Sequence, residues 1–172
     1  MSAVETKLPL RTAMEARDRA AVVETFADDA VLRSPFTDNL VFEGREQIDA
    51  LVAVVLDVLD DLTYTDELHG DGAAVLVGHA RVDGLRLQFT DHLKLRADGL
   101  IEEMTVFFRP LPASTAAMRR FGGGLGRRKS RLRARVVSSM VAPLTFMTRT
   151  GDRLGVRLVK PSPRTNGRGQ RT

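Results

Sequence analysis

Residues 85–95, LRLQFTDHLKL, alternate apolar and polar side chains, which is the pattern of a half-buried β-strand. One residue breaks this pattern, because Asp91 falls on the apolar face between Phe89 and Leu93. Burying an unpaired charge costs several kcal/mol, which is comparable to the net stability of a whole domain. Asp91 must therefore be paired, be protonated or line a cavity. A cavity position would make it the centre of a pocket.

The order of the predicted elements favours an α+β fold. Helices are expected over 12–27, in one or two pieces around Asp18, and over 45–60, where an apolar stripe recurs at helical spacing. Between them we expect a short strand at 28–35 and a loop. Four strands separated by glycine-containing turns follow, at 62–69, 73–82, 85–95 and 100–109. Helices followed by hairpin-connected strands are typical of α+β proteins.

Charge divides the chain into two parts. Residues 1–112 carry 11 Lys/Arg and 21 Asp/Glu, a net charge of −10, whereas residues 113–172 carry 15 Lys/Arg and one acid, a net charge of +14. We therefore expect a domain over 1–112 and a basic C-terminal extension over 113–172, with a helical part. GGGLG at 122–126 predicts a flexible glycine hinge, and the last dozen residues resemble a disordered end.

The extension suggests three kinds of contact. Its basic stretch at 127–135 runs directly into an apolar one, and this suits peripheral contact of 127–150 with a membrane surface or a protein groove. We predict that residues 127–150 are helical and dock on the acidic domain, because two oppositely charged parts are joined in one chain, and peripheral membrane binding is the competing outcome. Nucleic acid is not expected, because no aromatic residues are interleaved with the arginines.

Several classes of site and location are not expected. The chain has no cysteine and three scattered histidines, so neither a metal site nor a cofactor is predicted. No signal peptide or membrane span is visible in the sequence, and a cytoplasmic location is expected.

The turn at 96–99 suggests how the last two strands pair. If it pairs Leu95 with Leu100, Asp91 faces Met104. The inner face of the second strand is then expected to carry Leu100, Glu102, Met104, Val106 and Phe108. A bent sheet wrapped round helices makes a cone with an apolar interior, which is a ready ligand site.

Three stretches carry a resemblance to a known superfamily. FADDAVLRSP (26–35), EGREQI (43–48) and TDHLKLRADGLIEEMTVFF (90–108) resemble the nuclear-transport-factor-two-like (SnoaL-like) superfamily of α+β cones, over about residues 8–112. The resemblance implies a cystatin-like fold, with a curved antiparallel sheet wrapped on helices. The superfamily hosts isomerases, hydrolases, cyclases, dehydratases and binding domains.

Within the superfamily the stretches look most like the ketosteroid isomerase branch. Aligned through FADDA, that branch's oxyanion carboxylic acid falls on Asp91, its general base on Ser34 and its oxyanion tyrosine near Leu10. Serine is not basic near neutral pH and leucine cannot donate a hydrogen bond. Steroid isomerisation by the branch's familiar mechanism is therefore not expected.

Asp91 and Tyr64 are the candidate catalytic residues. The expected ligand-binding residues are Arg33, Ser34, Phe36, Leu51, Val55, Phe89, Glu102, Met104 and Phe108. Plainer alternatives stay open: Asp91 as a structural carboxylate paired with Tyr64, Arg33 or a backbone donor, Tyr64 as a core residue, and Glu102 as either a dyad partner of Asp91 or a solvent-exposed acid.

Two functions follow from these expectations. The first is binding of a small hydrophobic ligand in the cone, with acid/base chemistry of an isomerase, hydrolase or cyclase at Asp91. The second is a non-catalytic dimeric interaction module whose basic tail contacts a membrane surface or a protein partner. A homodimer is expected through the outer sheet face, which the pattern predicts to carry Val75, Val77, Ile101 and Phe107. An open cavity favours the first function and a filled cone the second.

Overall fold

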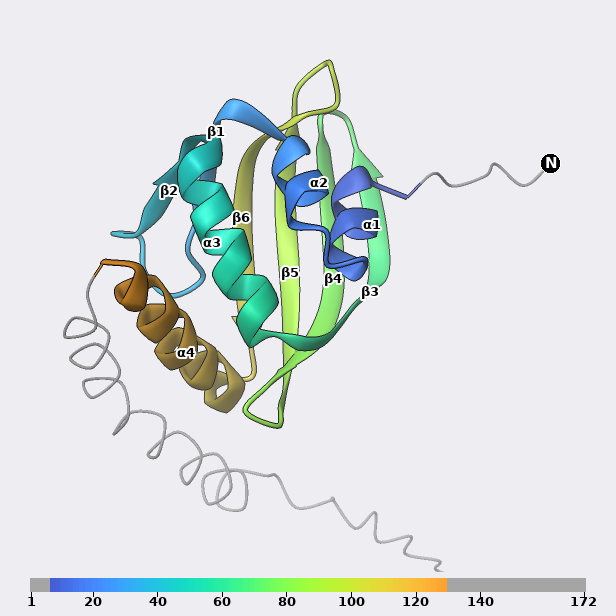
Figure 1. The fold of residues 1–172 in the computed structure, drawn as a ribbon. Coiled ribbons are helices and arrows are strands. Elements are labelled where there is room, and N and C mark those ends of the chain that lie inside the picture. The colour runs from blue at the N-terminus through green and yellow to red at the C-terminus, as the bar shows by residue number, and fades with distance from the viewer. Residues whose placement is uncertain (1–6, 130–172) are drawn as a thin grey trace, which may run out of the picture.

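The computed structural model describes residues 7–129, and their architecture is α+β, as the sequence predicts (Figure 1). One six-stranded sheet is built from β1 (Phe26–Arg33), β2 (Val41–Glu43), β3 (Asp60–Gly70), β4 (Ala73–Val82), β5 (Leu85–Leu95) and β6 (Ile101–Arg109). Its helices are α1 (Pro9–Glu15), α2 (Arg19–Glu24), α3 (Gly44–Val58) and α4 (Leu111–Lys129). Figure 1 shows α1, α2 and α3 over one face of the sheet and α4 beside one end of α3.

The strand order is β2-β1-β6-β5-β4-β3. Neighbouring strands are antiparallel except for β1 and β6, which run parallel. Register shifts interrupt the pairing of β1, of β3 and of the β5–β6 hairpin. Such bulges bend a strand and increase its twist, so they let the sheet curve around the helices.

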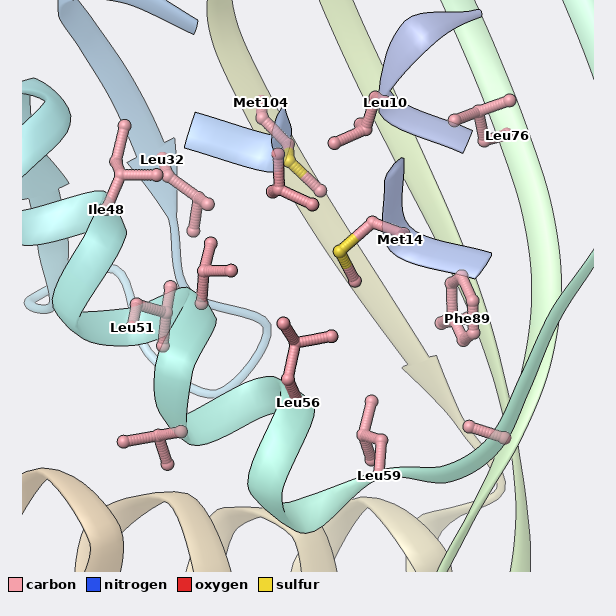
Figure 2. Packing of buried hydrophobic residues seen from close by; sticks show 14 of the residues in the cluster. Leu10, Met14, Leu32, Ile48, Leu51, Leu56, Leu59, Leu76, Phe89 and Met104 are labelled. Atoms are coloured by element: carbon pink, nitrogen blue, oxygen red, sulfur yellow. The ribbon is translucent and has the colours of Figure 1, made fainter. Parts of the chain in front are cut away.

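Buried side chains fill the space between the helices and the sheet (Figure 2). Leu51 and Leu56 of α3, together with Leu10 of α1, extend toward Met104 and Phe89 on the sheet. The apolar stripe predicted on 45–60 is therefore the inner face of α3.

The first helical segment differs from its prediction. The expected helix over 12–27 is two short helices, because Arg17 adopts a left-handed conformation (φ 57°) and Asp18 starts α2. The Asp18 carboxylate accepts a hydrogen bond from the Ala21 backbone N–H at 3.0 Å, which caps that helix. Residues 26–27 belong to β1 rather than to a helix, and 41–43, expected within a loop, form β2.

The predicted register of the last hairpin is wrong by one residue next to the turn and by two residues beyond a bulge. Leu95 pairs with Ile101 rather than with Leu100, and Asp91 pairs with Val106 rather than with Met104. Since Lys94 pairs with Glu103, Glu102 is an extra residue on β6. This residue shifts the alternation, so Ile101 points inward and Glu102 outward.

The predicted glycine hinge at 122–126 is wrong, because α4 runs through it. A Cβ placed on Gly124 would lie 2.5 Å from Cγ1 of Val54, so this glycine allows α4 to pack closely on α3. Glycine costs about 0.5–1 kcal/mol relative to alanine in a helix interior, and α4 carries four glycines over 122–126. Its earlier residues Ala113, Ala116 and Ala117 are fully buried, so α4 is part of the cone's core and not of an extension beyond residue 112.

Other predictions for the extension and for assembly are not tested by this structure. Most of the basic segment 127–150 and the expected disordered end lie outside the described residues. On the outer sheet face, Phe107 is 57% exposed and Val75 and Val77 are half-buried, whereas Ile101 is buried on the inner side and is wrongly assigned to that face. The homodimer stays a prediction. None of the helices within residues 7–129 is long and apolar enough to cross a membrane.

Candidate functional site

A cavity of about 340 Å³ lies between the helices and the inner face of the sheet. All four helices contribute to its wall, as do β1, β2, β3, β5, β6 and the loop over 34–40. Almost every lining side chain is apolar, and the polar exceptions are Ser34, Thr37, Tyr64 and Asp91. The volume is at the lower end of the range usual for small-molecule pockets.

Asp91 and Tyr64 form a hydrogen-bonded pair in the wall of this cavity. The Tyr64 hydroxyl donates to Oδ2 of Asp91 at 3.1 Å, and the two residues are only 2% and 3% exposed, respectively. Asp91 comes from β5 and Tyr64 from β3, with β4 between them. Within residues 7–129, Tyr64 is the side chain whose hydrogen bond reaches the Asp91 carboxylate.

A glycine on the intervening strand leaves room for the ring that packs against the phenol. Gly78 pairs with Tyr64 on one side and with Phe89 on the other. A Cβ at Gly78 would lie 2.5 Å from Cζ of Phe89, so its absence leaves room for the Phe89 ring. The rings of Tyr64 and Phe89 meet edge to face, with centroids 5.2 Å apart and planes at 90°.

The backbone of Tyr64 is bound from the other side by α1. The Tyr64 N–H donates to the Glu15 carboxylate at 3.0 Å, and the Arg11 guanidinium donates to the Tyr64 carbonyl at 3.0 Å. Glu67 accepts from the Leu8 backbone N–H at 2.7 Å and also pairs with Arg11. These bonds join α1 to β3 beside its bulge, so both the ring and the backbone of Tyr64 are constrained.

Burial controls the charge of the pair. Removal from water raises the pKa of Asp91 to about 7, against the lowering effect of the Tyr64 hydrogen bond. Burial, followed by the nearby Asp91 charge, raises the pKa of Tyr64 well above its ordinary value. Near neutral pH, Asp91 is therefore divided between acid and carboxylate, while Tyr64 remains a phenol.

The two protonation states of Asp91 differ in what they offer a ligand. As a carboxylate, Asp91 accepts the one proton that Tyr64 can donate, so the pair has no donor left. As a carboxylic acid, the pair carries two protons and can donate one of them to an oxygen in the cavity.

The structure brings most of the predicted site residues together. Besides Asp91 and Tyr64, the cavity is lined by the predicted residues Ser34, Phe36, Leu51, Val55, Phe89, Met104 and Phe108. The Ser34 Oγ accepts a hydrogen bond from the Phe36 backbone N–H at 3.2 Å. Leu10, where the resemblance expects a tyrosine, is an apolar lining residue, and the phenol comes instead from Tyr64.

Two predicted site residues lie outside the cavity. Glu102 is 57% exposed and lies 3.9 Å from Arg96, so its dyad with Asp91 is wrong. The β6 bulge turns it outward. Arg33 alternates with the inward-facing Leu32 on β1 and is exposed, with its Nε 3.4 Å from Glu103, so it does not pair with Asp91.

The helix α4 adds lining residues that the sequence reasoning missed. Met118, Phe121, Gly122 and Leu125 face the cavity. They lie at positions i, i+3, i+4 and i+7, which is a helical signal. The interpretation of 122–126 as a flexible joint hid this signal. Among residues 7–129, no group of three histidines or acids is arranged to hold a metal ion.

Solved structures with a similar backbone place this chain among the cystatin-like α+β cones. An uncharacterized bacterial protein from Silicibacter pomeroyi matches with a TM-score of 0.62 at 19% identity, covering 70% of this chain and 82% of that one. A steroid delta-isomerase from Pseudomonas aeruginosa matches with a TM-score of 0.60 at 28% identity, covering 72% and 88%. A protein with a ketosteroid isomerase-like fold from Catenulispora acidiphila, in complex with trimethylamine, matches with a TM-score of 0.53 at 16% identity, covering 67% and 92%.

The family follows from the sequence itself. Residues 10–104, more than half of the chain, match the model of the SnoaL-like domain. The chain therefore belongs to the SnoaL-like family, as the resemblance predicts. A search of curated proteins finds no match.

Proposed function

We propose that this protein binds a small, mostly apolar molecule in the cone and holds one oxygen of that molecule at the Asp91–Tyr64 pair. The observation that carries the proposal is the buried Tyr64–Asp91 hydrogen bond in the wall of an otherwise apolar cavity. A largely apolar pocket with a few convergent polar groups is the usual form of a small-molecule site. A carbonyl compound fits this pattern, because its oxygen accepts the proton that the acid form of the pair can donate.

The chemistry proposed at this site is acid catalysis on such a carbonyl compound, by isomerisation, hydrolysis or cyclisation. Donation of a proton or a strong hydrogen bond to the carbonyl oxygen stabilises the charge that develops there. A pKa near 7 suits a group that gives and regains a proton at neutral pH. Ser34 lines the cavity but is not basic, so Asp91 would have to act both as the acid that donates a proton and as the base that takes one back. The similarity to a steroid delta-isomerase at 28% identity supports a largely apolar ligand.

Two probes of matched shape test the proposal. 2-Acetylnaphthalene has an apolar body and one carbonyl oxygen, and naphthalene is the control without that oxygen. We expect the ketone to bind more tightly below pH 7 and to lose roughly two- to tenfold in affinity as Asp91 ionises, because the donor is then lost. Naphthalene should bind independently of pH. Titration calorimetry from pH 5 to 9 measures both affinities.

The Asp91→Asn variant is the internal control for the donor. Its amide N–H can donate to the ketone at every pH, so the pH dependence should disappear while binding remains. Equal binding of ketone and naphthalene at all pH values would contradict a role for the pair. If neither probe bound, the result would favour the alternative of a non-catalytic interaction module.

A further inference from the structure

Two halves of α4 are anchored differently. In the first half, Ala113, Ala116 and Ala117 are fully buried, and Arg119 and Arg120 both form ion pairs with Asp83 in the β4–β5 turn. The second half contains the glycine-rich stretch 122–126, in which four of five residues are glycine. Glycine gains the most backbone freedom when a helix opens, so this half is the weaker helix.

The weak half of α4 is also a wall of the cavity. Phe121, Gly122 and Leu125 line it directly. The loop over 34–40 packs against them, since the rings of Phe36 and Phe121 meet at a centroid distance of 6.0 Å with planes at 61°. Leu40 of this loop lines the cavity and is 40% exposed, so we call this side of the cavity its rim. The edge contact between the two rings joins the two sides of the rim.

The loop side of the rim is held by its own hydrogen bonds. The Ser34 N–H donates to the Leu40 carbonyl at 3.2 Å, and the Phe36 N–H donates to the Ser34 Oγ. Two further bonds, from Leu40 N–H to the Thr37 carbonyl and from Asn39 N–H to the Thr37 Oγ1, lie within the loop. Both sides are hydrogen-bonded, the loop by these bonds and α4 by its helical backbone, but α4 contains the four glycines that weaken a helix, so we expect the rim to open at the glycines.

We infer that the second half of α4, from Phe121 to Leu125, is a movable wall that swings away from α3 and the Phe36 loop to admit the ligand. The first half, fixed by its buried alanines and by Asp83, stays in place as the base of this motion. Openings of this kind belong to the locally weak parts of a fold. The inference rests on the proposed ligand-binding function, because the wall matters only if the cavity is filled.

The contact between α3 and α4 allows a specific lock. A Cβ built on Gly124 lies 3.5 Å from the Cβ of Val54, which is within the range for a disulfide. The chain contains no cysteine, so a Val54→Cys/Gly124→Cys variant can form only this intramolecular disulfide. Neither residue lines the cavity. Reduction of the same protein supplies the unlocked state.

Stopped-flow measurements with 2-acetylnaphthalene test the movable wall. In the oxidised double variant we expect association and dissociation rates both to fall at least about tenfold, with the Kd changed little, because access is blocked and the site is not. Dithiothreitol should restore both rates. Val54→Cys alone, treated with the same oxidant, should keep wild-type rates. Unchanged rates in the oxidised double variant would overturn the inference.

Hydrogen exchange of the wild-type protein tests the wall without a ligand. The amides of 121–125 should exchange at least about tenfold faster than those of 113–119 through local opening. Equal protection of the two halves would overturn the inference. If the ketone does not bind the reduced variant or the wild type, the proposed function fails. The exchange rates then still decide whether the wall moves.

Discussion

The two ends of the cavity are built in contrasting ways. At the sheet end, Tyr64 and Asp91 come from the two strands that flank β4 in one continuous sheet, and hydrogen bonds and an edge-to-face ring contact fix them. At the rim, the rings of Phe36, Phe108 and Phe121 pack against one another with centroids 5.5–6.2 Å apart, and Phe121 belongs to the glycine-rich half of α4. The contrast teaches that the polar pair is held rigidly by the sheet, whereas the shape of the cavity and the access of a ligand to it depend on the second half of α4.

Gly78 at the sheet end and Gly124 at the rim allow the difference in rigidity between the two ends of the cavity to be measured. A Cβ on either Gly78 or Gly124 would approach its nearest neighbour at 2.5 Å. At Gly78 the neighbours include the Thr63 backbone carbonyl at 2.7 Å as well as the Phe89 ring, and neither can rotate away freely. At Gly124 the neighbouring atoms all belong to the Val54 side chain. A Cβ would be equally close to its nearest neighbour at the two positions, but we expect alanine to destabilise the fold more at Gly78 than at Gly124.

The largest expected effect is on the pH dependence of stability. The pKa of Asp91 is about 7 in the folded protein and about 3.8 when unperturbed, so between these pH values the folded state binds more protons than the unfolded state. The free energy of unfolding must therefore fall as pH rises from about 4 to 7, by up to about 4 kcal/mol from this group.

The Asp91→Asn variant should lose this contribution. Above pH 7 we expect it to be more stable than the wild type by up to about 4 kcal/mol, and near pH 4 we expect similar stabilities. Urea denaturation of both proteins from pH 4 to 8 measures the difference, in which effects of other groups cancel. If the free energies of unfolding of the two proteins changed with pH in parallel, Asp91 would not be a rigidly buried acid, and the sheet end would not be more rigid than the rim.

The glycine pair should give the next largest effect. Gly78→Ala is expected to destabilise the fold by about 3 kcal/mol, because overpacking against backbone cannot relax. Gly124→Ala should change stability by less than about 1 kcal/mol, since the gain in helix propensity offsets the adjustment of Val54. Thermal or urea unfolding compares the two variants. Similar losses at both sites would mean that the rim is packed as rigidly as the sheet.

Removing the phenol oxygen should have a smaller effect. Tyr64→Phe deletes one buried hydrogen bond, with an expected loss of about 1 kcal/mol in the free energy of unfolding. Because that bond lowers the pKa of Asp91, the same change should raise it above 7. An NMR titration of the Asp91 carboxyl carbon measures the shift. A lowered or unchanged pKa would contradict the pairing described here.

The smallest effect is expected at the anchor of α4. Asp83→Asn keeps a residue that tolerates the left-handed turn conformation (φ 49°) but removes the ion pairs with Arg119 and Arg120. These groups are partly exposed, so the expected loss is at most about 1 kcal/mol and should shrink at high salt. Denaturation at two salt concentrations measures it. A loss that does not depend on salt would assign the anchoring to the buried alanines instead.

Local pattern was sufficient for the elements that position the site. Strict alternation over 85–95 predicted β5 and the inward position of Asp91, and the stripe on 45–60 predicted the inner face of α3. These signals are reliable because each residue's face depends only on its near neighbours. The family resemblance then supplied the cone that brings these two elements together.

The remaining features depend on single residues or on distant contacts. The extra residue Glu102 reverses the alternation on β6, and a regular pattern contains no sign of such a bulge. The glycines at 122–126 are equally compatible with a flexible joint and with close helix packing. Only the position of Val54, some 70 residues earlier in the chain, decides between the two.

The place of α4 in the chain has a consequence for biosynthesis. The sheet is complete at Arg109, but the wall formed by Met118 to Leu125 is translated afterwards. A nascent or prematurely ended chain would hold all the strands and α1, α2 and α3 but not the α4 wall, so part of its apolar interior would be exposed, which is the kind of surface that chaperones bind and that promotes aggregation. Translation of α4 is therefore the step that adds the last helical wall of the apolar cavity described here.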